Sequence, residues 1–237
     1  MHAVSTSRDT DAMTSRRDER DSIAGVDGCR VGWVVASDDG TNVRVTVETS
    51  FAPVLQRFQV IGVDMPIGLP ATWDRAADRA ARRFLSPRSA TVFPTPPRQL
   101  LDARTYAEAN AISRNLFGKG LTKQTYNLFA KLREVDALIT VADVERVIEV
   151  HPECALRAMT GSVLPSKRTA GGRVLRRELL RPIFGNVVDT RLAGAAVDDV
   201  LDALAVLWSV RRYVAGEHIV FGDGTRDERG LVMQIIC

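Results

Sequence analysis

Acidic residues stand inside apolar segments at two distant places in the chain. Asp27 lies in the strand-like run IAGVDG (23–28), and Asp199 and Asp202 interrupt the apolar run DDVLDALAVLWSV. An ionised carboxylate among apolar side chains loses several kcal/mol of solvation unless it is paired, hydrogen-bonded or bound to a cation. Residues three apart on a helix share a face, so Asp199 and Asp202 can reach toward one point. This pattern predicts a divalent metal site.

Further candidates follow two other apolar runs. Asp64 ends the run QVIGVD (59–64), and the segment EVHPE contributes Glu149, His151 and Glu153. Carboxylate oxygens are the ligands that Mg²⁺ and Mn²⁺ prefer. Paired ions of this kind, about 3.5–4 Å apart, hydrolyse phosphodiesters. We therefore expect a Mg²⁺ or Mn²⁺ site with four metal ligands: Asp27, Asp64, Asp199 and Asp202.

Three of the four aspartates also have a purely structural interpretation. Asp27 precedes Gly28 and is a typical turn residue, and Asp64 can cap the turn before Met65-Pro66. Asp199 can serve as a first-turn helix acid.

The EVHPE segment adds three catalytic candidates with their own alternatives. His151 suits proton transfer because its reference pKa is near neutrality, although a histidine beside proline is as often structural. Glu149 lies in a strand whose alternation can turn it toward solvent, and Glu153 can simply begin the next helix.

Basic residues surround these acids in the sequence. Residues 74–140 contain twelve Lys or Arg against six Asp or Glu, and 166–181 contain six against one. Basic segments around an acidic centre suit a polyanion, so we expect nucleic acid as partner. The expected substrate-binding residues are Lys167, Arg168 and Arg88. A solvated helix face is the alternative for the arginines at helical spacing, Arg75, Arg79, Arg82 and Arg83.

The elements that must position these residues alternate between strand and helix. Strands are expected at 23–28, 30–36, 43–49, 59–64 and 147–153, and helices at 51–58, within 74–140, at 173–181 and at 198–215, before a terminal hairpin at 218–236 around Gly222 to Gly224. This order predicts an α/β, RNase H-like mixed five-stranded sheet with strand order 3-2-1-4-5, flanked by helices. Strands one and four are neighbours there, so Asp27 and Asp64 would meet where ligands gather.

Length and composition fit one domain. The chain has 237 residues, 45% hydrophobic and 26% charged, with a formal net charge of +3. We expect a disordered tail at 1–22 and a single domain at 23–237 with a helical insertion at about 74–140. No run approaches the roughly 18 apolar residues of a membrane span, which predicts a soluble, cytoplasmic protein. Three cysteines without a CxxC spacing indicate neither a disulfide framework nor a zinc site.

Several segments together resemble a known family. They are GVDGCRVGWVVA, GVDMPIGLP, PRSATVFPTPPR, GKGLTKQTYNLFAKLREVD, EVHPE, SKRTAGGRVLRRELL, DDVLDALAVLW and the closing RGLVMQIIC. As a set they resemble an uncharacterised domain-of-unknown-function family whose members are predicted RNase H-like nucleases. The resemblance implies a metal-dependent nuclease and covers nearly everything after residue 22.

A more distant resemblance concerns the last helix. Its DxxDA pattern at 199–203 is similar to that of RuvC-type Holliday-junction resolvases, where these acids bind metal and the enzymes work as dimers. The likeness implies metal binding by Asp27, Asp64, Asp199 and Asp202, and a homodimer. The chain departs from that pattern by having Asp at 64 rather than Glu and by adding EVHPE.

Two other function classes stay open at this point. One is a non-catalytic module that uses the same fold to bind nucleic acid or protein. The other is a nucleotide-binding phosphotransferase or ATPase, because sugar kinases also open with a strand, an acid and glycines. Those proteins need a second such lobe, and FGDGT at 221–225 is the candidate for a degenerate copy.

Overall fold

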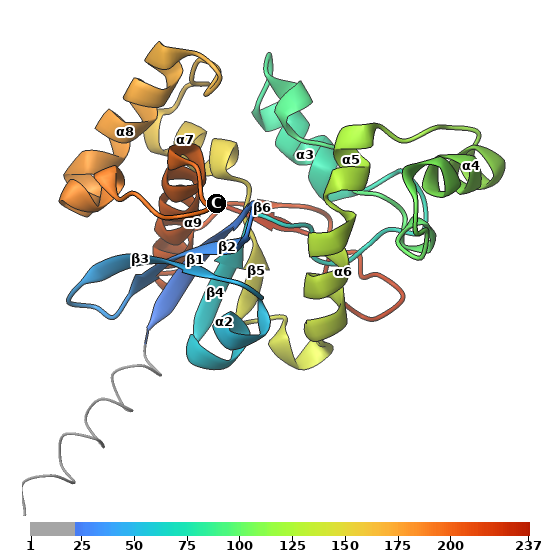
Figure 1. Cartoon of the computed structure of the whole chain (residues 1–237), viewed down its shortest axis with the longest axis horizontal. Coiled ribbons are helices and arrows are strands. Elements are labelled where there is room, and N and C mark those ends of the chain that lie inside the picture. The colour runs from blue at the N-terminus through green and yellow to red at the C-terminus, as the bar shows by residue number, and fades with distance from the viewer. Residues whose placement is uncertain (1–21) are drawn as a thin grey trace, which may run out of the picture.

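A five-stranded mixed sheet forms the centre of the computed structural model, which describes residues 22–237. The predicted tail at 1–22 lies outside the described residues except for Ser22. The strands are β1 (Ile23–Cys29), β2 (Gly32–Asp38), β3 (Val43–Glu48), β4 (Val60–Val63) and β5 (Val147–Glu149). Their order is β3-β2-β1-β4-β5, with β1 to β3 antiparallel and β4 and β5 parallel to β1 (Figure 1). The predicted RNase H-like sheet is confirmed.

Helices flank the sheet on both sides and rise above one of its edges (Figure 1). The α-helices are α2 (Ala52–Arg57), α3 (Ala76–Phe84), α4 (Tyr106–Phe117), α5 (Lys123–Asn127), α6 (Phe129–Leu138), α7 (Pro152–Thr160), α8 (Ala170–Phe184) and α9 (Val197–Val214). Short 3-10 turns are η1 (Ser89–Thr91), η2 (Arg98–Leu100), η3 (Val141–Asp143) and η4 (Gly185–Asp189).

The alternation of side chains along β2 divides the core into two layers. Trp33 and Val35 pack in a cluster with Phe129 and Leu132 of α6 on one face of the sheet. Val34 packs on the other face, in a cluster that includes residues of α8 and α9. Successive strand residues point to opposite faces, so one strand supports both layers.

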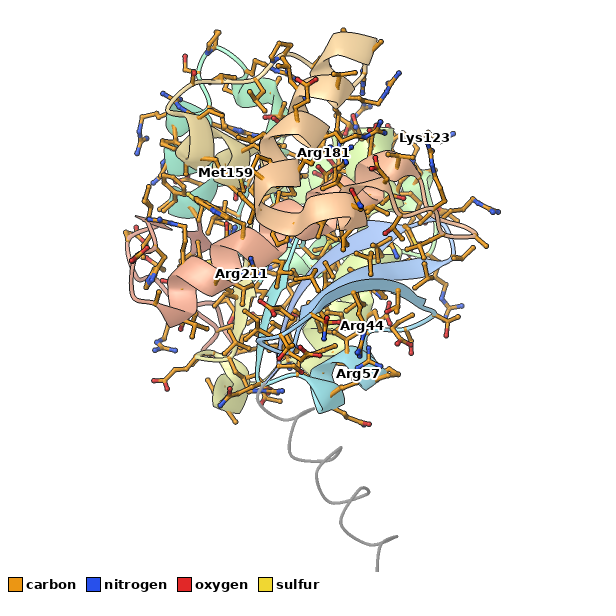
Figure 2. The ribbon with its side chains drawn as sticks, turned by 90° about the vertical axis from the view of Figure 1, so that its left-hand side faces the viewer. Arg44, Arg57, Lys123, Met159, Arg181 and Arg211 are labelled. Carbon is orange, nitrogen blue, oxygen red and sulfur yellow. The ribbon has the colours of Figure 1, made fainter. Side chains whose placement is uncertain are left out.

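Helix α9 lies directly on β1 because β1 carries a glycine at the contact. A Cβ built on Gly25 would come within 2.4 Å of the Ala203 carbonyl oxygen and 2.2 Å of the Leu207 amide nitrogen. Arg211 lies on α9 (Figure 2). It also ties the helix to β2 through Asp38, with an Nε to Oδ2 distance of 2.8 Å. The two backbones are therefore fixed relative to each other, which fixes Asp202 relative to Asp27.

The terminal hairpin exists, but its turn lies later than expected. β6 (Val220–Phe221) pairs antiparallel with β7 (Ile235–Ile236), and Arg226 bridges to Val232. The chain reverses around Asp227, whose Oδ1 accepts hydrogen bonds from the Arg229 and Leu231 amides. The prediction of a turn at Gly222 to Gly224 was wrong because a carboxylate that accepts two amide protons makes the stronger local turn.

The predicted fifth strand is shorter than 147–153. β5 ends at Glu149, and α7 begins at Pro152, with His151 at its N-cap position. Proline at the first helical position is favourable because its missing N–H needs no partner there. Glu153 therefore lies in the first turn of a helix.

Membrane-spanning helices and the state of the cysteines can both be examined in residues 22–237. No helix in this part of the chain is both long and apolar enough to cross a membrane. Cys29, Cys154 and Cys237 are buried free thiols, as the absence of a paired spacing predicted.

Candidate functional site

Strands β1 and β4 bring Asp27 and Asp64 to the same edge of the sheet. Their parallel register aligns Val26 with Val63, so the two aspartates follow aligned positions. The Asp64 amide donates to the Val26 carbonyl over 2.9 Å, and Asp27 Oδ1 accepts from the Gly28 amide over 2.8 Å. Asp27 is only 8% exposed, and Asp64 is half-buried. The predicted meeting of the two strand ends is confirmed.

Helix α9 adds Asp202 to the same place. Asp202 is 3% exposed, and its carboxylate forms an ion pair with the Lys167 ammonium, which comes from the turn before α8. The neighbouring Arg168 is exposed at the surface of this turn. Lys167 thus supplies positive charge to a group of acids that comes from three separate elements.

The shared position raises the pKa values of all three aspartates. Burial raises the pKa of Asp27 well above its usual range, and the charges of Asp64 and Asp202 raise it further. Burial also raises the pKa of Asp64 to about 7 and that of Asp202 to about 6, while Lys167 opposes both shifts. Burial lowers the pKa of Lys167, but the ion pair with Asp202 outweighs this and raises it. A cation beside these carboxyl groups would favour their ionised forms, so the site favours binding of a further cation.

These side chains line one cavity of about 720 Å³. Its lining includes Asp27, Asp64, Asp202, Lys167 and Arg168. Other walls come from the η1 region, from the start of α7 and from α5 and α6. Their cavity-lining residues include Arg88, Thr91, Phe93, Gln124, Asn127, Lys131, Glu149, His151 and Glu153. The structure therefore brings nine of the ten sequence-predicted site residues to a single cavity.

Asp199 is the predicted site residue that does not line this cavity. Its Oδ2 accepts a hydrogen bond of 2.8 Å from the Ala196 amide at the start of α9. Burial raises its pKa even though this bond and Lys167 lower it. Its hydrogen bond serves the helix start, as the first-turn interpretation described.

Glu149 is engaged in a buried ion pair with Arg75. Its two carboxylate oxygens lie 2.9 and 2.5 Å from Arg75 Nη1 and Nη2, and Oε2 also accepts from the Ile67 amide over 2.9 Å. Asp78 takes a further bond from Arg75 Nη1 over 3.0 Å. Arg75 is 2% exposed, so the interpretation of this arginine as part of a solvated helix face was wrong. The ion pair instead ties the N-cap residue of α3 to an acid of β5.

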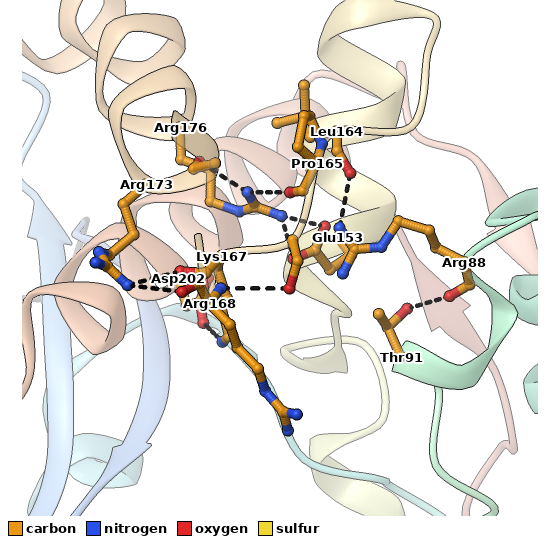
Figure 3. A network of polar contacts seen from close by, with 12 residues as sticks. Arg88, Thr91, Glu153, Leu164, Pro165, Lys167, Arg168, Arg173, Arg176 and Asp202 are labelled. Carbon is orange, nitrogen blue, oxygen red and sulfur yellow. Dashed lines mark hydrogen bonds and ion pairs between the residues drawn. The ribbon is translucent and has the colours of Figure 1, made fainter. Parts of the chain in front are cut away.

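Glu153 is engaged with another buried arginine, Arg176 of α8. Arg176 Nη2 lies 2.5 and 2.7 Å from the two Glu153 oxygens, and its Nη1 donates to the carbonyls of Pro165 and Gly172 (Figure 3). Arg88 Nη1 donates to the Leu164 carbonyl over 2.9 Å. These bonds fix the segment that leads into Lys167, so Glu153 and Arg176 position the lysine.

His151 presents its ring to the cavity. Its Nε2 lies 3.3 Å from the Thr91 carbonyl, and its buried Nδ1 has no hydrogen-bond partner within residues 22–237. Burial lowers the pKa of the ring, which makes the neutral form dominant at neutral pH. A neutral imidazole with one free nitrogen can accept a proton.

Lys131 of α6 is a cavity residue that the sequence interpretation missed. Its ammonium donates to the Gly32 carbonyl over 2.5 Å and lies 4.3 Å from the centre of the Trp33 ring. A Cβ on Gly28 would come within 2.7 Å of the Lys131 side chain. In the sequence, the glycine after Asp27 is the one signal for this close approach. A glycine at this position does not indicate which residue will lie against it.

A family model supports the relationship that the segments suggested. The model described as "Protein of unknown function (DUF429)" matches residues 25–226. The chain belongs to this family. Searches among curated proteins and among solved structures each gave no match. This membership confirms the resemblance to a domain-of-unknown-function family, and the description of the family assigns no activity.

The FGDGT segment, considered above as a degenerate second lobe, belongs to the region around β6. Phe221 packs against Phe84 of α3, with 4.9 Å between the ring centres, and Asp223 accepts hydrogen bonds from Thr225. None of residues 221–225 lines the cavity described above. In this position the segment supports α3 rather than facing the acids.

Proposed function

We propose that the protein is a metal-dependent nuclease that hydrolyses phosphodiester bonds at the cavity containing Asp27, Asp64 and Asp202. The observation that carries this proposal is the convergence of three aspartates from β1, β4 and α9, with raised pKa values and a single ion-paired lysine. Desolvated acids at this density are typical of functional sites.

The donor chemistry of the site fits a hard divalent cation. Aspartate oxygens are the ligands that Mg²⁺ and Mn²⁺ prefer, and burial, as the largest cause, raises the pKa values of Asp27 and Asp64. As arranged within residues 22–237, the side chains form no group of three or more His, Cys, Asp or Glu that could hold a metal ion. The assignment of Asp27, Asp64 and Asp202 as the metal-binding residues rests instead on charge and donor type, and we retain Asp199 as a nearby acid.

Bound metal would supply activated water and charge stabilisation for the leaving oxygen. The residues of this chain then have distinct tasks. His151 lines the cavity with a neutral ring oriented by the Thr91 carbonyl, which makes it the candidate proton acceptor. Lys167, Arg168 and Arg88 offer positive charge to phosphate, and Glu149 and Glu153 hold the cavity walls through Arg75 and Arg176.

Cleavage assays test this proposal. Labelled single-stranded, duplex, hybrid and branched nucleic acids are incubated with wild type in Mg²⁺, Mn²⁺ or EDTA. We expect metal-dependent cleavage that Asp27→Asn abolishes and that Asp102→Asn, an exposed acid outside the cavity, leaves intact. The melting temperature of Asp27→Asn should be unchanged or raised, because the substitution removes a buried charge.

Retained cleavage in Asp27→Asn would contradict the assignment. Nucleic-acid binding without turnover, unaffected by Asp27→Asn, would favour a non-catalytic binding module instead. Saturable ATP binding in a calorimeter would revive the phosphotransferase interpretation.

A further inference from the structure

We propose that the cavity accepts a single unpaired nucleotide, with its phosphate toward the aspartates and its base against Phe93. The orientation of the phosphate rests on the proposed function. The choice of an unpaired nucleotide rests on the depth and the wall chemistry of the cavity.

Depth argues against an intact double helix at the acids. Asp27 is 8% exposed and Asp202 is 3% exposed, and both line a cavity rather than an open surface. In a duplex each phosphate is held on the outside of a wide cylinder by paired and stacked bases. Enzymes with recessed centres act on single strands or extrude one nucleotide from the stack. The volume of about 720 Å³ lies within the range of pockets that enclose one small ligand.

The wall near η1 offers a platform for a base. Phe93 is 39% exposed although it is a large apolar side chain, and it lines the cavity together with Val92 and Leu128. An aromatic ring exposed in a cavity can stack on any nucleobase, because every base has a flat π face.

The wall from α5 offers hydrogen-bonding groups. Gln124 and Asn127 are exposed, line the cavity, and make no side-chain hydrogen bond to any residue in the described part of the chain. A carboxamide carries both a donor and an acceptor, the combination that pairs with the edge of a base. Lys131, Lys167 and Arg168 add the positive charge that a phosphate requires.

Fluorescence anisotropy tests the inference without relying on cleavage. The probes are a fluorescein-labelled oligonucleotide of about twelve residues, as single-stranded DNA, as single-stranded RNA and as a blunt duplex, in a Ca²⁺ buffer. AMP and UMP are added as competitors, so that a free nucleotide and a nucleotide within a strand are distinguished. The variants are Phe93→Ala and Phe93→Leu, with Leu116→Ala, an exposed residue of α4 outside the cavity, as control.

We expect single strands to bind at least about tenfold more tightly than the duplex. Both Phe93 variants should weaken single-strand binding by about fivefold or more, because each removes the stacking ring, and Leu116→Ala should not. If AMP or UMP displaces the labelled strand at concentrations at which the nucleotide by itself saturates the protein, the ligand is a free nucleotide. If neither nucleotide displaces the labelled strand, the ligand is a nucleotide within a strand.

Equal binding of duplex and single strand, unchanged binding in both Phe93 variants, or no binding of any probe would overturn the inference. These outcomes are separable from the proposed hydrolysis. Selective single-strand binding that depends on Phe93, without cleavage in Mg²⁺ or Mn²⁺, would leave the inference intact and contradict the nuclease proposal.

Discussion

The Lys167 ammonium forms an ion pair with the buried Asp202 carboxylate and thereby stands among the aspartates of β1, β4 and α9. It is held there by a turn that Arg176 and Arg173 fix through backbone carbonyls (Figure 3). A protein cation in this position stabilises the acids before any ligand arrives. It also competes with any metal that these acids bind.

Replacing Lys167 by Met should therefore have opposite effects with and without metal. In EDTA at pH 8 we expect a loss of roughly 1–3 kcal/mol of stability, because Asp202 keeps its charge and loses its partner. Saturating Mn²⁺ should raise the melting temperature of Lys167→Met by more than that of wild type. Thermal denaturation followed by circular dichroism measures both, with Lys123→Met, at an exposed lysine, as control. An equal Mn²⁺ shift in variant and wild type would contradict competition between lysine and metal.

The raised pKa of Asp64 predicts how stability depends on pH. Its folded pKa of about 7 lies above the unfolded value of 3.8, so its ionisation destabilises the native state most above pH 7. This cost disappears as the pH falls through 7 toward 4. In EDTA at pH 8, Asp64→Asn should raise the melting temperature by about 3–8 °C, and at pH 5 the difference should shrink markedly.

Asp102→Asn provides the control for this pH series, because Asp102 is exposed and lies outside the cavity. Its melting temperature should follow that of wild type at each pH. A constant difference between Asp64→Asn and wild type from pH 5 to pH 8 would refute a raised pKa at Asp64.

The Glu153 and Arg176 pair should matter more to stability than a surface pair. The side chain of Arg176 is 1% exposed and that of Glu153 is 11% exposed. Glu153→Gln leaves the guanidinium without its charge partner, and we expect a loss of about 3–5 kcal/mol in guanidinium chloride unfolding. Asp189→Asn, which breaks the exposed pair with Arg181, should change stability little. Comparable effects in the two variants would show that the Glu153 pair does not clamp the Lys167 turn.

The contact between α9 and β1 predicts a strict requirement for glycine at position 25. A methyl group there would overlap backbone atoms of Ala203 and Leu207, and overpacking of this kind costs about 1–3 kcal/mol or more. Gly171→Ala is the matched control, because a Cβ there meets no atom within 4 Å. Urea unfolding should show Gly25→Ala strongly destabilised and Gly171→Ala close to wild type. Wild-type stability in Gly25→Ala would mean that α9 is not seated on β1 as described.

The framework of the site could be predicted from sequence because its signals are local. Alternating apolar runs and turn residues define the strands, and the order of elements predicts the adjacency of β1 and β4. Asp27 and Asp64 end these two runs, so their meeting at one sheet edge followed from topology.

The partners of the other acids could not be predicted because they are distant in the chain. Arg75 reaches Glu149 across 74 positions, and Arg176 reaches Glu153 across 23. At helical spacing with other arginines, Arg75 has the pattern of a solvated face, and its burial and its ion pairs with Asp78 and Glu149 appear only in the fold. Lys131 and Phe93 could not be predicted as cavity residues for the same reason. The cavity walls depend on how the 74–140 segment folds back over the sheet edge.

The most direct test of the account is a calorimetric titration of Mn²⁺ into metal-free protein at pH 7.5. We predict saturable binding to wild type, loss of that binding in Asp27→Asn and in Asp202→Asn, and retention in Asp102→Asn. Mn²⁺ binding that is absent from wild type, or equal in wild type and both cavity variants, would contradict the central claim that these aspartates form a metal-dependent hydrolytic centre.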